Sequence, residues 1–164
     1  MRRTLIIFSS LLLSLFIASG QTRPRFEIES KYSLVHSNFG LMWLARAGGA
    51  VHVSNDWALN VEFGEGASAI NTYNHLYQVA GSVGYYFFQG GPSKFDLVSK
   101  IGGGLLWDRQ ADGSNMKKGF FFIEGNPRYN LTDNFFVGVS MYGLFAKDLR
   151  LTGFCNGLSV GVRF

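Results

Sequence analysis

Apolar and polar residues alternate along most of this chain with a period of two, and the last eleven residues show it most clearly. The apolar face of residues 154–164 consists of Leu158, Val160, Val162 and Phe164. The opposite face carries only small residues and Arg163. Because successive side chains of a β-strand point to opposite faces, this pattern predicts a strand with apolar surroundings on one side only.

The same alternation recurs in seven earlier segments, so the sequence predicts eight strands in all. They are residues 26–35, 41–53, 57–63, 76–87, 95–107, 119–131, 135–145 and 154–164. Gly48 and Gly49 inside the second segment predict a bend or bulge. Phe120 and Phe122 fall on the polar face of the sixth segment, and the pattern gives no reason for this.

The segments between the strands predict two kinds of connection. Tight turns are expected at residues 54–56, 89–93 and 132–134, where turn-forming residues cluster. Residues 65–74 and 108–118 are longer and polar, and are expected to be loops on the opposite side of the sheet. Short turns on one side and longer loops on the other are typical of barrels in the outer membrane.

Three properties favour a membrane barrel over a soluble sandwich. Seven of the eight segments have 10–13 residues. That is enough to cross a bilayer when tilted, which takes ~9–11 residues, whereas soluble strands cluster near ~5–6. Their apolar faces form a surface too large to expose to water. Aromatic residues gather near the strand ends, as in membrane-interface belts. The outer belt is expected to contain Tyr32, Trp43 and Trp107, and the periplasmic belt Trp57, Tyr85, Tyr129 and Phe164.

The fold class expected is therefore all-β, an eight-stranded antiparallel up-and-down transmembrane β-barrel, with a secreted soluble β protein as the alternative. The composition agrees, since aromatics make up 16% of the residues and the chain has 21 Gly but 3 Pro. After residue 20 no apolar run reaches the ~18 residues of a transmembrane helix. The chain has one Cys, Cys155, and no Cys/His cluster, so we expect no disulfide, metal site or cofactor.

Residues 1–20 are expected to be a cleaved signal peptide, with an N-terminal membrane anchor as the alternative. Arg2 and Arg3 precede the apolar stretch Leu5 to Ile17, and small residues precede a predicted cleavage between Gly20 and Gln21. The barrel domain would then be residues 21–164. Without Arg2 and Arg3 the 15 Lys and Arg fall to 13, against 11 Asp and Glu, so the charge indicates no nucleic-acid partner.

Ten charged residues fall on the faces that would line the barrel interior. They are Glu27, Glu29, Lys31, Arg46, Glu62, Asp96, Lys100, Glu124, Arg128 and Arg163. Eight strands enclose a lumen just wide enough for side chains or one small ligand. Because five acids oppose five bases, a paired and packed charge network is expected in preference to a one-signed selectivity pore.

Catalytic candidates are few, and we expect no enzyme activity. His36 and Ser37 lie in a predicted loop without a matching acid, and His52 and His75 are expected to be hydrogen-bonding residues in the interior and at the interface. The basic residues expected to contact lipopolysaccharide at the outer rim are Lys117, Lys118, Lys147 and Arg150.

The export signal, the eight strands, the segment Tyr129 to Val139 and the terminal Phe164 together resemble the small OmpA-like and opacity-type outer-membrane barrels, the outer membrane protein β-barrel domain group. The resemblance implies location in the outer membrane of a Gram-negative cell envelope and insertion by the barrel-assembly machinery. It also implies that the terminal residues Leu158 to Phe164 form an assembly signal and that outer-membrane lipid or lipopolysaccharide is a partner. A structural or surface-interaction role is expected.

Two functional alternatives stay open at this point. One is a lipid-modifying barrel enzyme similar to the lipid A deacylase, whose His-x-Ser-Asn pattern is not matched by His36-Ser37-Asn38. The other is a narrow, porin-like pore for small solutes. The oligomeric state does not follow from the sequence, and a monomer is the simplest expectation.

Overall fold

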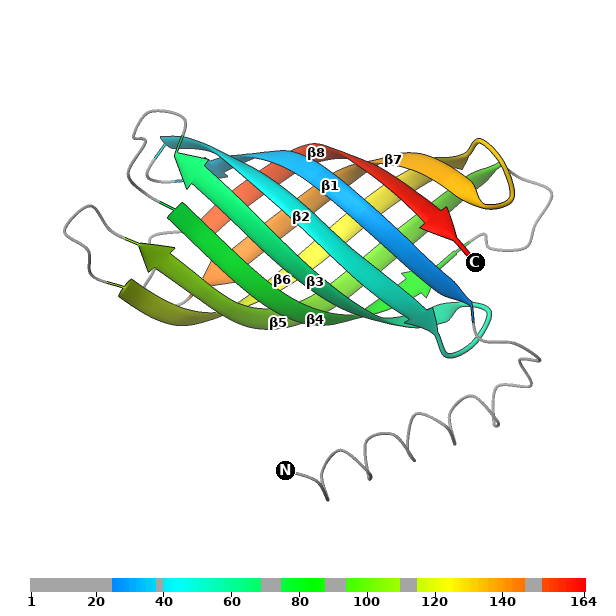
Figure 1. Cartoon of the computed structure of the whole chain (residues 1–164), viewed down its shortest axis with the longest axis horizontal. Helices are drawn as coiled ribbons and strands as arrows, with labels where there is room; N and C mark the ends of the chain where they lie inside the picture. The colour runs from blue at the N-terminus through cyan, green and yellow to red at the C-terminus, as the bar shows by residue number, and fades with distance from the viewer. Residues whose placement is uncertain (1–24, 38–39, 69–74, 88–93, 110–114, 147–151) are drawn as a thin grey trace, which may run out of the picture.

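The chain forms a closed eight-stranded antiparallel β-barrel in the computed structural model, so the predicted fold class is confirmed (Figure 1). The structure describes residues 25–37, 40–68, 75–87, 94–109, 115–146 and 152–164. The strands are β1 (Phe26–Ser37), β2 (Gly40–His52), β3 (Trp57–Ser68), β4 (His75–Tyr86), β5 (Phe95–Arg109), β6 (Asn115–Asn130), β7 (Phe135–Ala146) and β8 (Thr152–Arg163). Each strand pairs with the next, and β8 returns to pair with β1.

The seam between the first and last strands closes the barrel. Glu27 pairs with Arg163 at one end of the seam and His36 pairs with Phe154 at the other. Phe164 extends this ladder, because its backbone N–H donates to Phe26 O at 2.8 Å and its carbonyl accepts from Phe26 N–H at 3.2 Å. A closed ladder leaves no sheet edge, which is the condition for a sheet to cross hydrocarbon.

The two short turns at one end of the barrel are built in the same way. Ser54 Oγ accepts hydrogen bonds from the backbone N–H groups of Asp56 and Trp57, at 3.3 and 3.1 Å. Thr132 Oγ1 does the same for Asn134 and Phe135, at 3.3 and 3.0 Å. These hydroxyl-capped turns fit the predicted tight connections. We call this end, which also holds Phe26 and Phe164, the turn end, and the opposite end the loop end.

The predicted contrast between short turns and long loops is wrong. β3 continues to Ser68, while β5 and β6 run to Arg109 and from Asn115, so residues 65–68, 108–109 and 115–118 of the segments expected as loops are strand. The longest connection between strands, residues 87–94, lies at the turn end. The polar residues that suggested loops, such as Glu65 and Lys117, occupy exposed positions on these strand ends.

Two local predictions also fail. Gly48 and Gly49 form no bulge, because β2 pairs in continuous register with both β1 and β3 through these positions. His36, expected in a loop, lies in β1 with an exposed side chain. The predicted signal peptide and the Gly20–Gln21 cleavage position fall outside the described residues. In the ranges that the structure describes, no helix has the length and hydropathy to cross a membrane.

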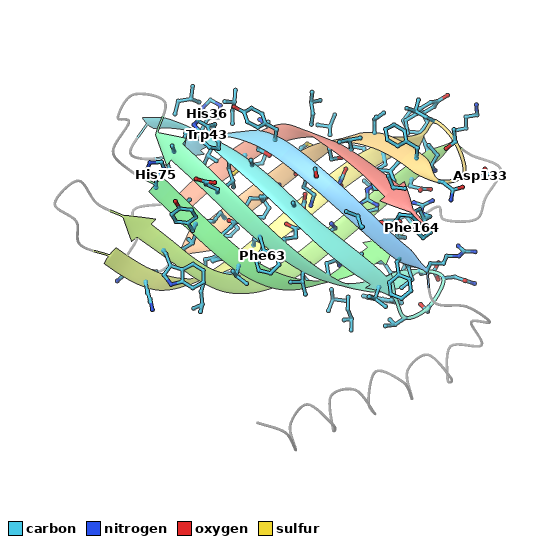
Figure 2. All side chains as sticks on the ribbon, in the orientation of Figure 1. His36, Trp43, Phe63, His75, Asp133 and Phe164 are labelled. Atoms are coloured by element: carbon cyan, nitrogen blue, oxygen red, sulfur yellow. The ribbon has the colours of Figure 1, made fainter. Side chains whose placement is uncertain are left out.

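The outward face of the barrel is apolar over most of its height, and its side chains project from the wall in Figure 2. Ile101 and Leu158, for example, are 61% and 71% exposed. Aromatic rings cluster at both ends of this face. Tyr32 stacks on Trp43 toward the loop end, at 6.3 Å between ring centroids, whereas Trp57 contacts Tyr85 edge-on at 4.8 Å at the turn end. Two belts therefore border the apolar band, as predicted.

The inward face is divided along the barrel axis. A cluster of buried apolar residues fills the loop end: Val35, Met42, Leu44, Leu76, Ala80, Leu106, Phe120, Phe122, Tyr142, Leu144, Ala146 and Cys155. A smaller cluster of Ala50, Ala58, Tyr86 and Val98 lies near the turn end. The inward positions of Phe120 and Phe122 are explained by this first cluster, because both rings are buried in it. The Phe122 ring packs with its centroid 4.9 Å from that of Tyr142.

Inward-facing glycines make room for the large side chains that fill the lumen. An added Cβ at Gly64 would lie 2.6 Å from Gln78 Cγ and 3.1 Å from Arg46 Cγ. At Gly138 it would lie 2.8 Å from both Asn126 Oδ1 and Ser159 Oγ. Real Cβ atoms do not approach so closely, so these glycines are required by the packing of the interior.

We therefore expect Gly138→Ala to destabilise the folded barrel by about 1–3 kcal/mol, the usual cost of overpacking a filled core. Gly125→Ala is the matched control on β6, because its Cβ would meet nothing within 4 Å. Urea unfolding of both variants in phospholipid vesicles measures the difference. Equal stability of the two variants would contradict the requirement for space at position 138.

Candidate functional site: a buried charge network

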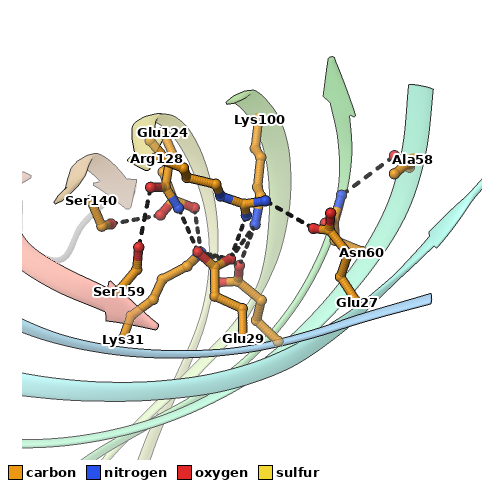
Figure 3. A network of polar contacts seen from close by, with 12 residues as sticks. Glu27, Glu29, Lys31, Ala58, Asn60, Lys100, Glu124, Arg128, Ser140 and Ser159 are labelled. Atoms are coloured by element: carbon orange, nitrogen blue, oxygen red, sulfur yellow. Dashed lines mark hydrogen bonds and ion pairs between the residues drawn. The ribbon is translucent and has the colours of Figure 1, made fainter. Parts of the chain in front are cut away.

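The barrel interior contains a connected network of ion pairs that extends from its centre to the turn end, and Figure 3 shows part of it. Its members are the ten charged residues named from the sequence: Glu27, Glu29, Lys31, Arg46, Glu62, Asp96, Lys100, Glu124, Arg128 and Arg163. All except Arg163 are at most 6% exposed. Three of them, Glu27, Glu29 and Lys31, lie at alternate positions of β1, so this strand contributes more charged residues to the network than any other strand.

Lys31 lies at the centre of the network. Its Nζ is 2.6 Å from Glu62 Oε1, 2.8 Å from Glu124 Oε2 and 3.3 Å from Glu29 Oε2, so each of its three N–H donors has a carboxylate oxygen in reach. Arg46 bridges two of the same carboxylates from the other side, at 3.2 Å from Glu62 and 3.5 Å from Glu124. The centre therefore joins β1, β2, β3 and β6.

Toward the turn end the network converges on Glu27. Its Oε2 accepts hydrogen bonds from Arg128 Nη1 and the Tyr86 hydroxyl, both at 2.8 Å. Its Oε1 accepts from Arg163 Nε at 2.8 Å. Arg163 continues to Asp96 Oδ2 at 3.1 Å, and its side chain, 15% exposed, is the part of the network that reaches solvent. Charge-assisted bonds of this kind are about twice as strong as neutral ones.

Neutral groups and aromatic rings complete the coordination of the charges. Asn126 Nδ2 donates to Glu29 Oε1 at 2.5 Å, and the Ser140 hydroxyl donates to Glu124 Oε1 at 2.6 Å. Arg46 Cζ lies 4.1 Å from the centroid of the Tyr142 ring, and Arg128 Cζ lies 4.2 Å from that of Phe136. These cation–π contacts occur where water is excluded, and there they are strongest.

Sequence reasoning missed two aromatic members of the site, Tyr86 and Phe136. Strict alternation could have found both: their neighbours Tyr85 and Phe135 were assigned outward, which places the next residue inside. The predicted hydrogen-bonding role of His52 is not seen. His52 is buried against the Tyr86 ring at 4.5 Å, with Nε2 3.3 Å from Glu27 Oε1, but within the described part of the chain neither ring nitrogen meets the geometry of a hydrogen bond.

The interior Ser140 and the candidate His36 are not brought together. The Ser140 hydroxyl donates to Glu124, whose carboxylate is held in ion pairs with Lys31 and Arg46, and His36 is on the outside of the barrel. His75 is at the rim, 3.9 Å from Glu65. Among the residues that the structure describes, no group of His, Cys, Asp and Glu has the geometry to hold a metal ion.

Comparison with solved structures relates this barrel to proteins of the bacterial outer membrane. The N-terminal β-barrel domain of Pseudomonas aeruginosa OprF matches with a TM-score of 0.62 and 20% identity, covering 85% of this chain and 97% of that domain. Neisserial surface protein A matches with a TM-score of 0.61 and 15% identity, covering 85% of this chain and 95% of that protein.

A third match extends the comparison to another bacterium. Ail, the attachment invasion locus protein of Yersinia pestis, matches with a TM-score of 0.53 and 14% identity, covering 86% of this chain and 97% of that one. The fold is that of the small eight-stranded outer-membrane β-barrels.

The relationship is one of structure, since no family model and no curated protein sequence matches the chain. An outer-membrane barrel has an apolar outer wall in contact with lipid and a polar interior, and this chain has both. The predicted location in the outer membrane agrees with that of the matching structures. A buried ion-pair network thus occupies the interior of a small outer-membrane barrel.

We expect Lys31→Met to destabilise the barrel by about 3–5 kcal/mol, because it leaves buried carboxylates without their counter-charge. Glu65→Gln, which removes the carboxylate 3.9 Å from His75 at the exposed rim, should cost less than about 1 kcal/mol. Adding Glu124→Gln to Lys31→Met should recover part of the lost stability by removing one uncompensated charge. Unfolding in urea measures all three, and a loss in Lys31→Met no larger than that in Glu65→Gln would contradict this account.

Proposed function

We propose that this protein is a non-conducting integral barrel of the outer membrane with a structural or surface-interaction role. The observation that carries the proposal is that the described part of the lumen is filled. The charge network extends from its middle to the turn end, where the smaller apolar cluster packs beside it, and the larger apolar cluster lies toward the loop end. Fully buried side chains such as Arg128, Phe122 and Tyr142 leave no wide aqueous path between the ends.

The pairing of the charges supports the same proposal. A pore needs water or mobile ions along its length, and it is usually lined by one sign of charge. Here each of the five carboxylates contacts a base directly. Opening a channel would separate these pairs in a narrow lumen, where an unpaired charge is costly.

A lipid-modifying enzyme is the alternative that the site supports least. Such a reaction needs a nucleophile, a base and an orienting acid in contact. Ser140 donates to Glu124, whose carboxylate is also paired with Lys31 and Arg46, and the His36 side chain faces the outside of the barrel. We therefore assign no catalytic residue. An altered lipid A acylation pattern in a deletion strain would overturn that assignment.

We further propose the sequence-based route of biogenesis. The chain would be exported by residues 1–20, processed between Gly20 and Gln21, and inserted by the barrel-assembly machinery as a monomer. Leu158, Val160, Val162 and Phe164 all face outward on the strand that closes the seam, which suits an assembly signal read before closure. Lys117, exposed at the loop end, supports contact with lipopolysaccharide, whereas Lys147 and Arg150 lie outside the described residues.

The filled lumen predicts that the refolded protein forms no stable ohmic channel in planar lipid bilayers. The double variant Phe122→Ala, Tyr142→Ala removes two rings from the loop-end cluster and should raise the leak measurably, because it opens space beside Arg46. Insertion is checked independently by protease protection. Regular conductance steps from the wild-type barrel would overturn the non-conducting proposal.

The lipid-facing wall predicts a depth-dependent cost of charge. Ile101→Arg places a cation on the outward face in the middle of β5 and should lower the free energy of unfolding in vesicles by about 2–4 kcal/mol. Leu131→Arg, in the turn after β6, should cost only about 0–1 kcal/mol, because an arginine there reaches the interface. Similar costs for both variants would argue against hydrocarbon around the wall.

A further inference from the structure

A small cavity lies inside the charge network between β1, β2, β3 and β5. Its volume is about 10 Å³. The lining residues are Glu27, Glu29, Gly48, Gly49, Ala50, Asn60, Glu62 and Lys100. A cavity of this size holds about one water-sized molecule, and it does so only when polar groups in its wall can bind that molecule.

One N–H group of Lys100, in the wall of the cavity, has no acceptor among the described residues. Lys100 Nζ contacts Glu29 Oε2 at 3.0 Å and Glu62 Oε1 at 3.3 Å, which accounts for two of its three N–H groups. Lys31, the other lysine of the network, has a carboxylate for each of its three donors. Lys100 therefore has one N–H group that can donate to a molecule in the cavity, which it lines.

One acceptor in the wall, the side-chain oxygen of Asn60, also lacks a donor among the described residues. Asn60 is 4% exposed, and its Nδ2 donates to the carbonyls of Ala58 and Ser82 at 3.4 and 3.5 Å. Those bonds orient the amide, while Asn60 Oδ1 accepts no hydrogen bond from the residues that the structure describes. Burying an amide oxygen without a donor costs its full desolvation free energy, so we expect this atom to bind a donor in the cavity.

The charges around the cavity select a neutral occupant. An anion would meet three carboxylates, those of Glu27, Glu29 and Glu62. A cation would have to displace the bases Lys31, Lys100 and Arg128, which already pair with these carboxylates. The molecule that fits must accept one hydrogen bond from Lys100 and donate to Asn60 and a carboxylate. Water has this combination of two donors and two acceptors in the available volume.

We propose that the cavity is a binding site for one ordered water molecule that joins Lys100 Nζ to Asn60 Oδ1 and to one of the three carboxylates. This water links β5 to β3 at a point where no direct contact between Lys100 and Asn60 is made. The site rests on the fold and the network alone. It would stand even if the barrel conducted ions through another path.

The test is magnetic resonance of the isotope-labelled barrel in micelles, with water as the probe. We expect cross-relaxation between water and the backbone amide protons of Gly49 and Ala50, with the sign that marks long-lived bound water. Asn60→Leu keeps the side-chain volume but removes the acceptor, so these cross-peaks should be lost. Gln78→Leu is the matched control, because Gln78 is a buried inward amide on β4 that does not line the cavity.

Each other outcome overturns the proposal. Absence of the cross-peaks from the wild-type barrel would show that the cavity holds no ordered water. Cross-peaks that persist in Asn60→Leu would show proton exchange relayed by Lys100. Loss of the cross-peaks in Gln78→Leu would show a general effect of interior repacking. Shifts of the Gly49 and Ala50 amides when sodium is replaced by choline would assign the site to a cation. Gel mobility with and without heating verifies that each variant is folded.

Discussion

The requirement that buried charges be neutralised inside a closed sheet governs this structure. With β1 paired to β8, the backbone has no edge and the lumen no side opening, so the ten interior charges must satisfy one another. Lys31 and Arg46 hold the carboxylates of Glu62 and Glu124 from two sides. Removal of a partner at this centre leaves a buried charge without its counter-charge, and this makes the arrangement specific.

The same requirement explains the composition. Large charged and aromatic side chains fit an eight-stranded lumen only where the adjacent strand presents almost no side chain at the paired position, and inward positions such as Gly64, Gly138 and Gly161 supply that space. On the outside, lipid replaces the second sheet of a sandwich, so large apolar residues such as Ile101 and Leu158 remain exposed to it. High glycine and high aromatic content are therefore two consequences of one architecture.

The sequence was sufficient to predict which way side chains point but not which of them meet. Period-two alternation placed Glu27 and Lys31 inside the barrel, because it depends only on strand geometry. The partners are up to 136 positions apart, as for Arg163 and Glu27, and their contact depends on strand register and tilt. The prediction of connection lengths was wrong for a different reason: polar residues at the rim of a barrel can extend a strand as readily as they can form a loop.

The division of the interior along its axis limits where function can lie. The apolar cluster around Phe120, Phe122 and Leu144 separates the charge network from the loop end. At the turn end Arg163 is partly exposed, so solvent reaches the network from that side. With the interior closed as proposed, interactions at the loop end would use the strand ends there. A packed, charge-paired interior is then the means by which a small barrel holds those rims in a fixed geometry.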